Sequence, residues 1–301
     1  MSKPFFSIVI PTFNRSKIIS RSVDSVLRQT FSDYEIIIID NGSNDNTDEL
    51  IQKKYKDAKI KYFYQEGSGS PANPRNKGIE LAKGRWICFL DSDDEWFPNK
   101  LEVVFETIKD SPECEVICHN ERYFSETEQS PGRVIRYGPN SENMYKDMLI
   151  YGNRLSTSAV SLKKDFLKKF KLNFDEDPNL ATVEDYDLWL NLALRNARFK
   201  FIKDALGYYY FGGQNLISYS KKFCVNLEFL LRKHVFEIQN FEHDNDKLWN
   251  FLSLRLEVCL SIYNSKNYLT KLVLLSKTFF KSPGNFLKLF TGYSLKKINA
   301  R

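Results

Sequence analysis

The segment Tyr34–Asp40 contains four consecutive isoleucines, and this run constrains the fold more than any other part of the chain. An apolar run without polar alternation is typical of a strand that is buried on both faces, as in parallel sheets covered by helices. Three further short apolar runs, Ser7–Ile10, Ile60–Tyr64 and Trp86–Leu90, lie close to it in the chain. We therefore expect four buried strands in this part of the sequence.

Helical patterns separate these four runs. Asn46 or Thr47 can cap the second helix, which has two acidic residues in its first turn, and Gly78–Ala82 lies in the third. The first helix is marked by apolar residues that fall on one face, namely Ile18, Ile19, Val23, Val26 and Leu27. The resulting β-α-β-α-β-α-β order predicts an α/β fold with a mostly parallel sheet, right-handed crossovers and flanking helices.

The alternation loosens beyond Asp110. In the next hundred residues we expect a hairpin or a loop at 121–137, a helix over Val183–Arg195, and strands at 116–118, 157–162, 199–202 and 207–211. From about Tyr219 the sequence is helical in character. A length of 301 residues allows one large domain with an appendage, so we predict a sheet-containing domain over 1–218 and a helical, basic C-terminal region over 219–301.

The basic residues are concentrated at the C-terminus. Residues 258–301 contain eight Lys or Arg residues and no Asp or Glu, which leaves 36 basic residues against 38 acidic ones in the rest of the chain. Apolar residues alternate with these lysines, so the tail can form helices with an apolar face that bind an anionic membrane surface. The same pattern is compatible with packing of that face on the body. Because no nucleic-acid-binding motif accompanies the charge, we expect no nucleic-acid partner.

The cysteines and the N-terminus indicate the compartment. Five cysteines are scattered along the chain without a second pair at zinc-ligand spacing, so we expect core thiols in a reducing compartment. The N-terminal apolar stretch is too short for a signal peptide, and no stretch approaches the roughly 20 apolar residues of a spanning helix. We expect a cytoplasmic protein, peripheral at the inner face of the cell membrane if the tail binds lipid.

An acidic cluster, Asp91-Ser92-Asp93-Asp94, follows the fourth predicted strand. Ligands of open α/β sheets bind at the carboxyl ends of strands, and Asp-x-Asp places two hard oxygen ligands on one side of an extended segment. Such a pair suits Mg²⁺ or Mn²⁺ that bridges a diphosphate. The glycine patterns of dinucleotide-binding folds and P-loops are absent after the first strand. The stretch 67–70 fits neither pattern, and we interpret it as a flexible connector.

Four motifs in collinear order resemble the family 2 glycosyltransferases of GT-A fold, in particular bacterial enzymes that build surface polysaccharides. They are Ser7–Arg15, Tyr34–Thr47, Pro74–Asp94 and Val183–Trp189, and the resemblance covers about residues 5–215. It implies an inverting glycosyltransferase with a nucleoside-diphosphate-sugar donor, UDP-hexose in particular, and a Mg²⁺ or Mn²⁺ cofactor. It also implies that the acceptor is a glycan or a polyprenyl-diphosphate-linked sugar in O-antigen or capsule synthesis.

The resemblance also implies roles for individual residues. Asp93 and Asp91 would bind the metal, while Asp185 would be the general base and Glu184 would complete the catalytic Glu-Asp motif. Because Asp185 would begin a helix, where the dipole stabilises its ionised form, we expect its pKa to be low. The residues that would contact the nucleotide sugar, among which the Asp40-Asn41 pair would face the base, are Pro11, Thr12, Asn14, Arg15, Asp40, Asn41, Arg75, Asn76, Asp91 and Ser92.

Two departures from the family pattern leave alternatives open. The family often has a second aspartate where this chain has Asn41, and some relatives bind the metal with a histidine after the last core strand, where this chain has none. We expect His119, His234 and His243 to be ordinary surface or core histidines. The competing functions are a sugar nucleotidyltransferase, whose glycine-rich first loop is missing here, and a non-catalytic nucleotide-sugar-binding or scaffold protein.

Overall fold

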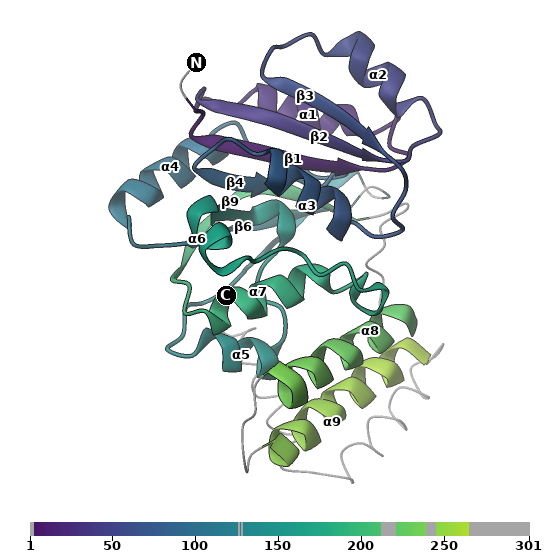
Figure 1. The fold of residues 1–301 in the computed structure, drawn as a ribbon, viewed down its shortest axis with the longest axis vertical. Helices are drawn as coiled ribbons and strands as arrows, with labels where there is room; N and C mark the ends of the chain where they lie inside the picture. The colour runs from purple at the N-terminus through teal and green to yellow at the C-terminus, as the bar shows by residue number, and fades with distance from the viewer. Residues whose placement is uncertain (1–2, 126, 128, 212–220, 239–244, 265–301) are drawn as a thin grey trace.

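The computed structural model describes residues 3–125, 127, 129–211, 221–238 and 245–264 of the chain. Within this part, a nine-stranded sheet has the strand order β3-β2-β1-β4-β8-β6-β9-β5, and β7 pairs with β6 outside that path. Helices cover the sheet on both sides, with α3 in front and α1 behind it in Figure 1. The predicted α/β architecture with flanking helices is confirmed.

The first four strands are parallel and are connected by three helices, as predicted. In chain order, the elements are β1 Phe6–Thr12, α1 Ile19–Leu27, β2 Tyr34–Asn41, α2 Thr47–Lys54, β3 Ile60–Gln65, α3 Ala72–Leu81 and β4 Trp86–Phe89. The four isoleucines of β2 show why the sheet needs two helical layers. Ile36 and Ile38 belong to the core beneath α1, and Ile37 and Ile39 to the core on the side of α3. Because successive strand residues point to opposite faces, each face must be covered.

The chain from 95 to 211 completes the sheet. Its elements are β5 Glu95–Trp96, α4 Lys100–Asp110, β6 Val116–Ser125, β7 Ser130–Ile135, α5 Met144–Tyr151, the 3₁₀ turn η1 Thr157–Ala159, β8 Val160–Lys163, α6 Lys164–Phe170, the 3₁₀ turn η2 Pro178–Leu180, α7 Glu184–Leu194 and β9 Phe199–Phe211. β8 runs antiparallel to both β4 and β6. The hairpin alternative for 121–137 is correct, since β6 and β7 are antiparallel neighbours.

Two strand predictions need correction. The segments 199–202 and 207–211 form one continuous strand, β9, because its register with β6 shifts and lets the polar residues Lys203 and Asp204 stay within the strand without regular pairing. The predicted strand at 157–162 begins instead with the 3₁₀ turn η1, and only Val160–Lys163 is extended. Helices α5 and α6 were not predicted from the pattern of apolar residues.

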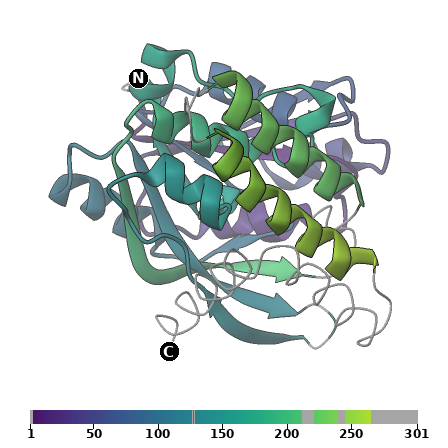
Figure 2. The ribbon, with the colours of Figure 1, turned by 90° about the horizontal axis from the view of Figure 1, so that it is seen from below.

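The C-terminal region is helical where it is described, as predicted. It contains α8 Lys221–Arg232, the π-helical segment η3 Lys233–Ile238 and α9 Asn245–Asn264. Seen from below, α8 and α9 lie side by side over α5 and α7 (Figure 2). The basic residues after 264, and with them the membrane-binding prediction, lie outside the described residues. No helix in the described ranges combines the length and the apolar character needed to cross a membrane.

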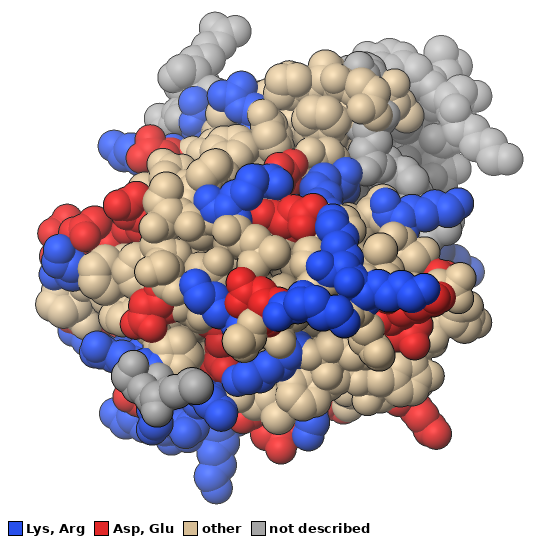
Figure 3. Space-filling view, turned by 90° about the horizontal axis from the view of Figure 1, so that it is seen from above, with Lys and Arg blue, Asp and Glu red and all other residues tan. Residues whose placement is uncertain are grey.

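Charged side chains of both signs mix on the face that carries α2 and β3 (Figure 3). Lys54 lies 2.7 Å from Asp24, and Lys61 lies 2.6 Å from Glu35. The buried side chains also agree with the sequence: His119 and His234 lie in the interior, as do the free thiols of Cys88, Cys114, Cys118 and Cys224. The side chain of Cys259 and all of His243 lie outside the described part.

Candidate active site

A cleft of about 510 Å³ opens at the carboxyl ends of β1, β2 and β4, where the first turns of α3 and α7 also meet. Parallel strands explain this position, because their carboxyl ends share one edge of the sheet. Ten of the thirteen predicted site residues line the cleft, namely Pro11, Thr12, Arg15, Asn41, Arg75, Asp91, Ser92, Asp93, Glu184 and Asp185.

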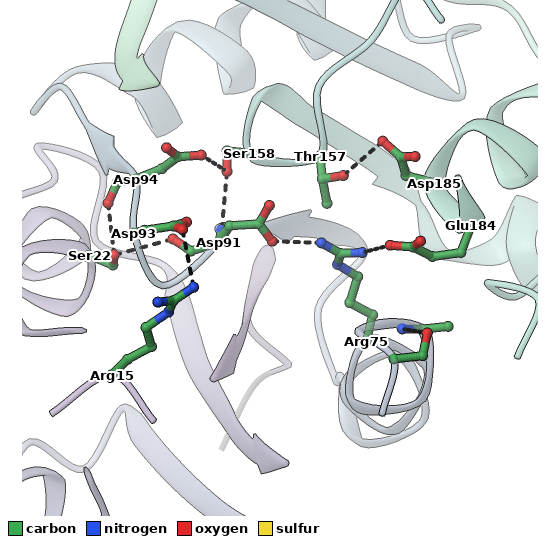
Figure 4. A network of polar contacts seen from close by, with 12 residues as sticks. Arg15, Ser22, Arg75, Asp91, Asp93, Asp94, Thr157, Ser158, Glu184 and Asp185 are labelled. Atoms are coloured by element: carbon green, nitrogen blue, oxygen red, sulfur yellow. Dashed lines mark hydrogen bonds and ion pairs between the residues drawn. The ribbon is translucent and has the colours of Figure 1, made fainter. Parts of the chain in front are cut away.

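Arg75 links the acidic loop after β4 to the first turn of α7 (Figure 4). Its guanidinium donates to Oδ1 of Asp91 at 2.7 Å and to Oε1 of Glu184 at 2.6 Å, and its side chain is only 6% exposed. Burial opposes the positive charge, but the two carboxylates outweigh it and raise the pKa of Arg75. Burial also raises the pKa of Glu184 to about 8, and Arg75 offsets part of this effect. The bridge therefore ties two acidic residues together across the cleft.

The loop 91–94 is held from beneath by two serines. The Asp91 amide donates to Oγ of Ser158 at 3.1 Å, and the Ser22 hydroxyl donates to the Asp94 carbonyl oxygen at 2.8 Å. Both carboxylate oxygens of Asp94 accept internal hydrogen bonds, one from Ser158 and one from the Tyr210 amide. Asp94 therefore braces the loop, and its oxygens are already engaged.

The surroundings of Asp93 fit a metal ligand. Its side chain is 20% exposed, and Nη2 of Arg15 lies 3.6 Å from its Oδ2, beyond hydrogen-bond distance. Burial and the charge of Asp91 raise the pKa of Asp93, so a cation here would relieve the repulsion between two carboxylates. In the part of the chain that the structure describes, no three acidic, His or Cys side chains form a metal cage. Mg²⁺ does not require one, because it commonly combines one or two carboxylates with water and substrate phosphates.

Asp185 reaches the cleft from the first turn of α7. Its Oδ1 accepts a hydrogen bond from the Tyr186 amide at 2.6 Å. Its Oδ2 accepts from Oγ1 of Thr157 at 3.4 Å (Figure 4). The same oxygen accepts from Nδ2 of Asn153 at 3.3 Å. The expectation of a low pKa is wrong, because burial raises the pKa of Asp185 more than Arg75 and the hydrogen bonds lower it. A raised pKa makes the ionised carboxylate a stronger proton acceptor.

The Asp40-Asn41 pair is divided between the interior and the cleft. Asp40 is fully buried, and its carboxylate accepts from the Ser43 amide at 2.8 Å and from the Tyr62 hydroxyl at 2.7 Å. Asp40 therefore supports the turn after β2 and does not line the cleft. Asn41 does line it, and its carbonyl oxygen accepts from Gln65 at 2.9 Å.

Asn14 and Asn76 also lie outside the cleft wall and act as braces. Asn14 has a φ of +53°, and its backbone amide donates to Oγ of Ser43 at 2.8 Å. Its side-chain Oδ1 accepts from the Asn44 backbone amide at 2.8 Å. Asn76 exchanges hydrogen bonds with the backbone of Phe174 at 2.8 and 2.9 Å. The first side chain joins the loops after β1 and β2, and the second joins α3 to the segment that leads to α7.

The glycosyl transferase family 2 model matches residues 7–170, which is more than half of the chain. The chain belongs to glycosyl transferase family 2. It is 30% identical to the putative teichuronic acid biosynthesis glycosyltransferase TuaG of Bacillus subtilis, over 63% of this chain and 72% of that protein. It is 29% identical to the putative colanic acid biosynthesis glycosyl transferase WcaA of Escherichia coli, over 77% and 82%.

Other relatives match a shorter segment of this chain or are much longer proteins themselves. Over 97 residues, 32% of this chain and 38% of the relative, it is 41% identical to WfgD of Escherichia coli. That protein is named as a UDP-Glc:α-D-GlcNAc-diphosphoundecaprenol β-1,3-glucosyltransferase. The chain spans only 26–35% of the length of three Rickettsia glycosyltransferases to which it is 30–32% identical.

Solved structures confirm the predicted GT-A fold of this family 2 chain. S. aureus TarS in complex with UDP-GlcNAc matches with a TM-score of 0.64 and 20% identity, covering 95% of this chain and 83% of TarS. The mannosyltransferase PcManGT of Pyrobaculum calidifontis, in complex with GDP-Man and Mn²⁺, matches with a TM-score of 0.63 and 14% identity, covering 98% and 81%.

Several cleft residues of this family 2 chain were not predicted. The stretch 67–70, interpreted as a flexible connector, forms part of the wall, and the Ser68 amide donates to the Asn41 side chain at 3.2 Å. A Cβ on Gly42 would lie 2.7 Å from the Gly67 nitrogen, so only glycine allows this approach. In the sequence, Gly42 and Gly67 were the available signal that these two loops approach each other closely. Thr157 and Tyr209 also line the cleft, but they come from elements that carry no motif.

Proposed function

We propose that this chain is an inverting glycosyltransferase that moves a sugar from a nucleoside-diphosphate sugar, UDP-hexose in the first instance, to a hydroxyl of its acceptor. The acceptor would be a glycan or a polyprenyl-diphosphate-linked sugar in surface-polysaccharide synthesis. One observation carries the proposal: Asp91 and Asp93 lie across the same cleft from Asp185, with Arg75 between them (Figure 4). The names of TuaG, WcaA and WfgD support the substrate class.

The donor nucleotide would occupy the end of the cleft near β1 and β2. Phe13 is 53% exposed there and offers a flat face on which a base can stack. The Asn41 side chain is engaged with Gln65 and Ser68, so the neighbouring loop would share in binding the base. The UDP-GlcNAc complex of TarS supports a uridine donor, and the GDP-Man complex of PcManGT makes guanosine the alternative to test.

Asp93 and Asp91 would hold Mg²⁺ or Mn²⁺ together with the donor diphosphate. When bound, the metal neutralises charge that develops on the departing diphosphate. Arg15 beside Asp93 and Arg75 beside Asp91 would add fixed positive charge at the same place. The Mn²⁺ in the PcManGT structure supports this assignment for the fold.

Asp185 would act as the general base through Oδ2. It would take the proton of the acceptor hydroxyl while that oxygen bonds to the anomeric carbon on the face opposite the diphosphate. The bond between the anomeric carbon and the diphosphate oxygen breaks, and its electron pair leaves with the nucleoside diphosphate. Because one bond forms as the other breaks on the opposite face, the configuration inverts.

A donor panel tests the proposal. The purified chain is incubated with UDP-, dTDP- and GDP-sugars, Mg²⁺ or Mn²⁺ and a short diphosphate-linked acceptor, and released nucleoside diphosphate is measured. We expect acceptor-stimulated release with one donor. A sugar nucleotidyltransferase would instead form pyrophosphate from a nucleoside triphosphate and a sugar phosphate. A non-catalytic protein would bind the donor in calorimetry without turnover.

We also propose that the basic tail, which lies outside the described residues, attaches the enzyme to the inner face of the membrane. Each lysine near an anionic leaflet contributes about 1 kcal/mol, so four Lys→Gln changes should weaken vesicle binding by roughly a thousandfold. The changes are Lys271, Lys277, Lys281 and Lys288 to Gln. Flotation with phosphatidylserine-containing vesicles measures the effect. Failure of the parent to bind at low salt would leave the tail as a packed helix.

A further inference from the structure

The two carboxylate oxygens of Asp185 have different surroundings. Oδ1 is committed to the Tyr186 amide at 2.6 Å, within the same helical turn. From the described residues, Oδ2 accepts two long hydrogen bonds, from Asn153 at 3.3 Å and from Thr157 at 3.4 Å. An acceptor hydroxyl can displace such long contacts at little cost, so Oδ2 is the oxygen that an acceptor would meet. Asn153 and Thr157 then determine where this oxygen points before the acceptor arrives.

The direction of the Asn153 side-chain amide is fixed by a hydrogen bond from the backbone two residues further along. Its Oδ1 accepts from the Leu155 amide at 3.0 Å, which leaves Nδ2 directed at Asp185. Asn153 follows Gly152, which ends α5 with a φ of +94° and donates from its amide to the Met148 carbonyl oxygen at 2.7 Å. The position of Asn153 therefore depends on how α5 ends.

The end of α5 is held by a residue more than a hundred positions further along the chain. Nη1 of Arg255, on α9, donates to the carbonyl oxygens of Leu149 at 2.8 Å and of Ile150 at 3.1 Å. These carbonyls belong to the last turn of α5, where no helical amide is available to pair with them. Arg255 lies in the C-terminal region, beyond the residues 7–170 that the family model matches.

We propose that Asn153 and Arg255 are positioning residues for Asp185: Arg255 sets the end of α5, and through it Asn153 aims Oδ2 toward the acceptor. Helix α9 thereby contributes to catalysis although none of its described residues lines the cleft. This inference rests on the proposed role of Asp185 as the base. It explains why a helix outside the matched segment places a half-buried guanidinium against the backbone beside the cleft.

The test uses the full chain with four single variants. Asn153→Ala removes the amide from an exposed position, and Arg255→Met removes both hydrogen bonds while keeping an apolar stem. Arg255→Lys is the conservative rescue, and Arg232→Met on the neighbouring helix α8 is the matched control. Because a misplacement of about 1 Å can cost about 100-fold in rate, we expect a fall in kcat of about 10- to 100-fold for the first two variants. KM for the donor should stay within about twofold, and Arg255→Lys should recover most of the loss.

A double-mutant cycle separates positioning from general stability. Asn153→Ala combined with Asp185→Asn should be no slower than Asp185→Asn alone, because the first change acts only through the carboxylate. If the kcat losses of the two single variants multiply in the double variant, or if the donor KM of Asn153→Ala rises with unchanged kcat, the inference is overturned while Asp185 stays the proposed base. Full activity of Asp185→Asn would instead overturn the proposed function. If Arg255→Met does not fold, the exposed Asn153→Ala variant still decides the outcome.

Discussion

The close contact between α3 and β1 leads to a quantitative prediction about Gly78. A Cβ on Gly78 would lie 2.2 Å from Cγ1 of Val9, whereas nonbonded carbons prefer about 3.5–4.0 Å. In Gly78→Ala, α3 must therefore retreat from the sheet by about 1.5 Å unless Val9 gives way. Overpacking of this kind costs about 1–3 kcal/mol, and the better helix propensity of alanine returns about 1 kcal/mol. The free energy of unfolding should thus fall by about 0–2 kcal/mol.

The larger effect of Gly78→Ala should be on catalysis. Arg75 lies one helical turn before Gly78, and its hydrogen bonds to Asp91 and Glu184, at 2.7 and 2.6 Å, leave no room for a shift of the helix. A displacement of this size can cost about 100-fold in rate, so we expect kcat to fall by about 10- to 100-fold. Nucleotide-release kinetics measure kcat, and thermal unfolding measures stability.

A compensating change makes the prediction about Gly78 specific. Val9→Ala removes both methyl groups, and the nearest remaining atom of residue 9 would be its Cβ, at 3.1 Å from the new Cβ. Val9→Ala/Gly78→Ala should therefore recover most of the kcat lost in Gly78→Ala, although the lost burial lowers its stability. Val9→Ala alone is the control. Wild-type kcat in Gly78→Ala, or no recovery in the double variant, would refute the proposed geometry.

Three further changes test the site. Asp93→Asn should reduce turnover to the detection limit, because the amide cannot replace the carboxylate charge on the metal. It should not lower Tm in metal-free buffer, because the pKa of Asp93 is raised and its charge is therefore unfavourable there. A metal-dependent rise in Tm that survives the change would contradict the assignment. Asp185→Asn should cost about 10²–10⁴ in kcat with unchanged donor affinity in calorimetry. The ionised form of Asp185, which the proposed mechanism needs, is lost as pH falls through its pKa. Because that pKa is raised, the activity of the unmodified chain should fall on the acid side at a higher pH than an ordinary aspartate would give. Lys233→Met should lower the free energy of unfolding by about 1–3 kcal/mol in denaturant titration, because buried Asp187 loses a partner at 3.0 Å. An unchanged unfolding midpoint would contradict this prediction.

The alternation of the first four strands with helices and the location of the cleft follow from patterns that are local in the sequence, but the direction of single side chains does not. Asp40 and Asn41 are adjacent on one strand and point to opposite faces, and here Asp40 lies in the interior whereas Asn41 lines the cleft. Arg75 and Asn76 are adjacent on a helix, and a rotation of about 100° separates their directions. If every residue of a motif is given the same role, all four are assigned to the ligand. The backbone geometry instead directs the two side chains of each pair to different places.

Electrostatic expectations failed for a similar reason. The helix N-terminus predicted a low pKa for Asp185, but the favourable effect of a helix end is usually below about 1 kcal/mol at exposed sites. Burial acts in the opposite direction and is stronger here, because α7, the loop after α5 and the 3₁₀ turn η1 meet at the carboxylate. Burial depends on contacts between distant segments, which a single sequence does not reveal.

The first turn of α7 connects the two halves of the molecule. Its four residues point to different parts of the molecule: Glu184 pairs with Arg75, Asp185 enters the cleft, Tyr186 donates to the Met148 carbonyl oxygen, and Asp187 contacts Lys233 and His234. Burial opposes the charge of Asp187, but His234 and Lys233 outweigh it and lower its pKa. Leu230 and Leu252 of the C-terminal helices share a core with Ile37 of the sheet. The division at residue 218 therefore stays a prediction about sequence character, while the first turn of α7, which carries Asp185, is held by residues on both sides of it.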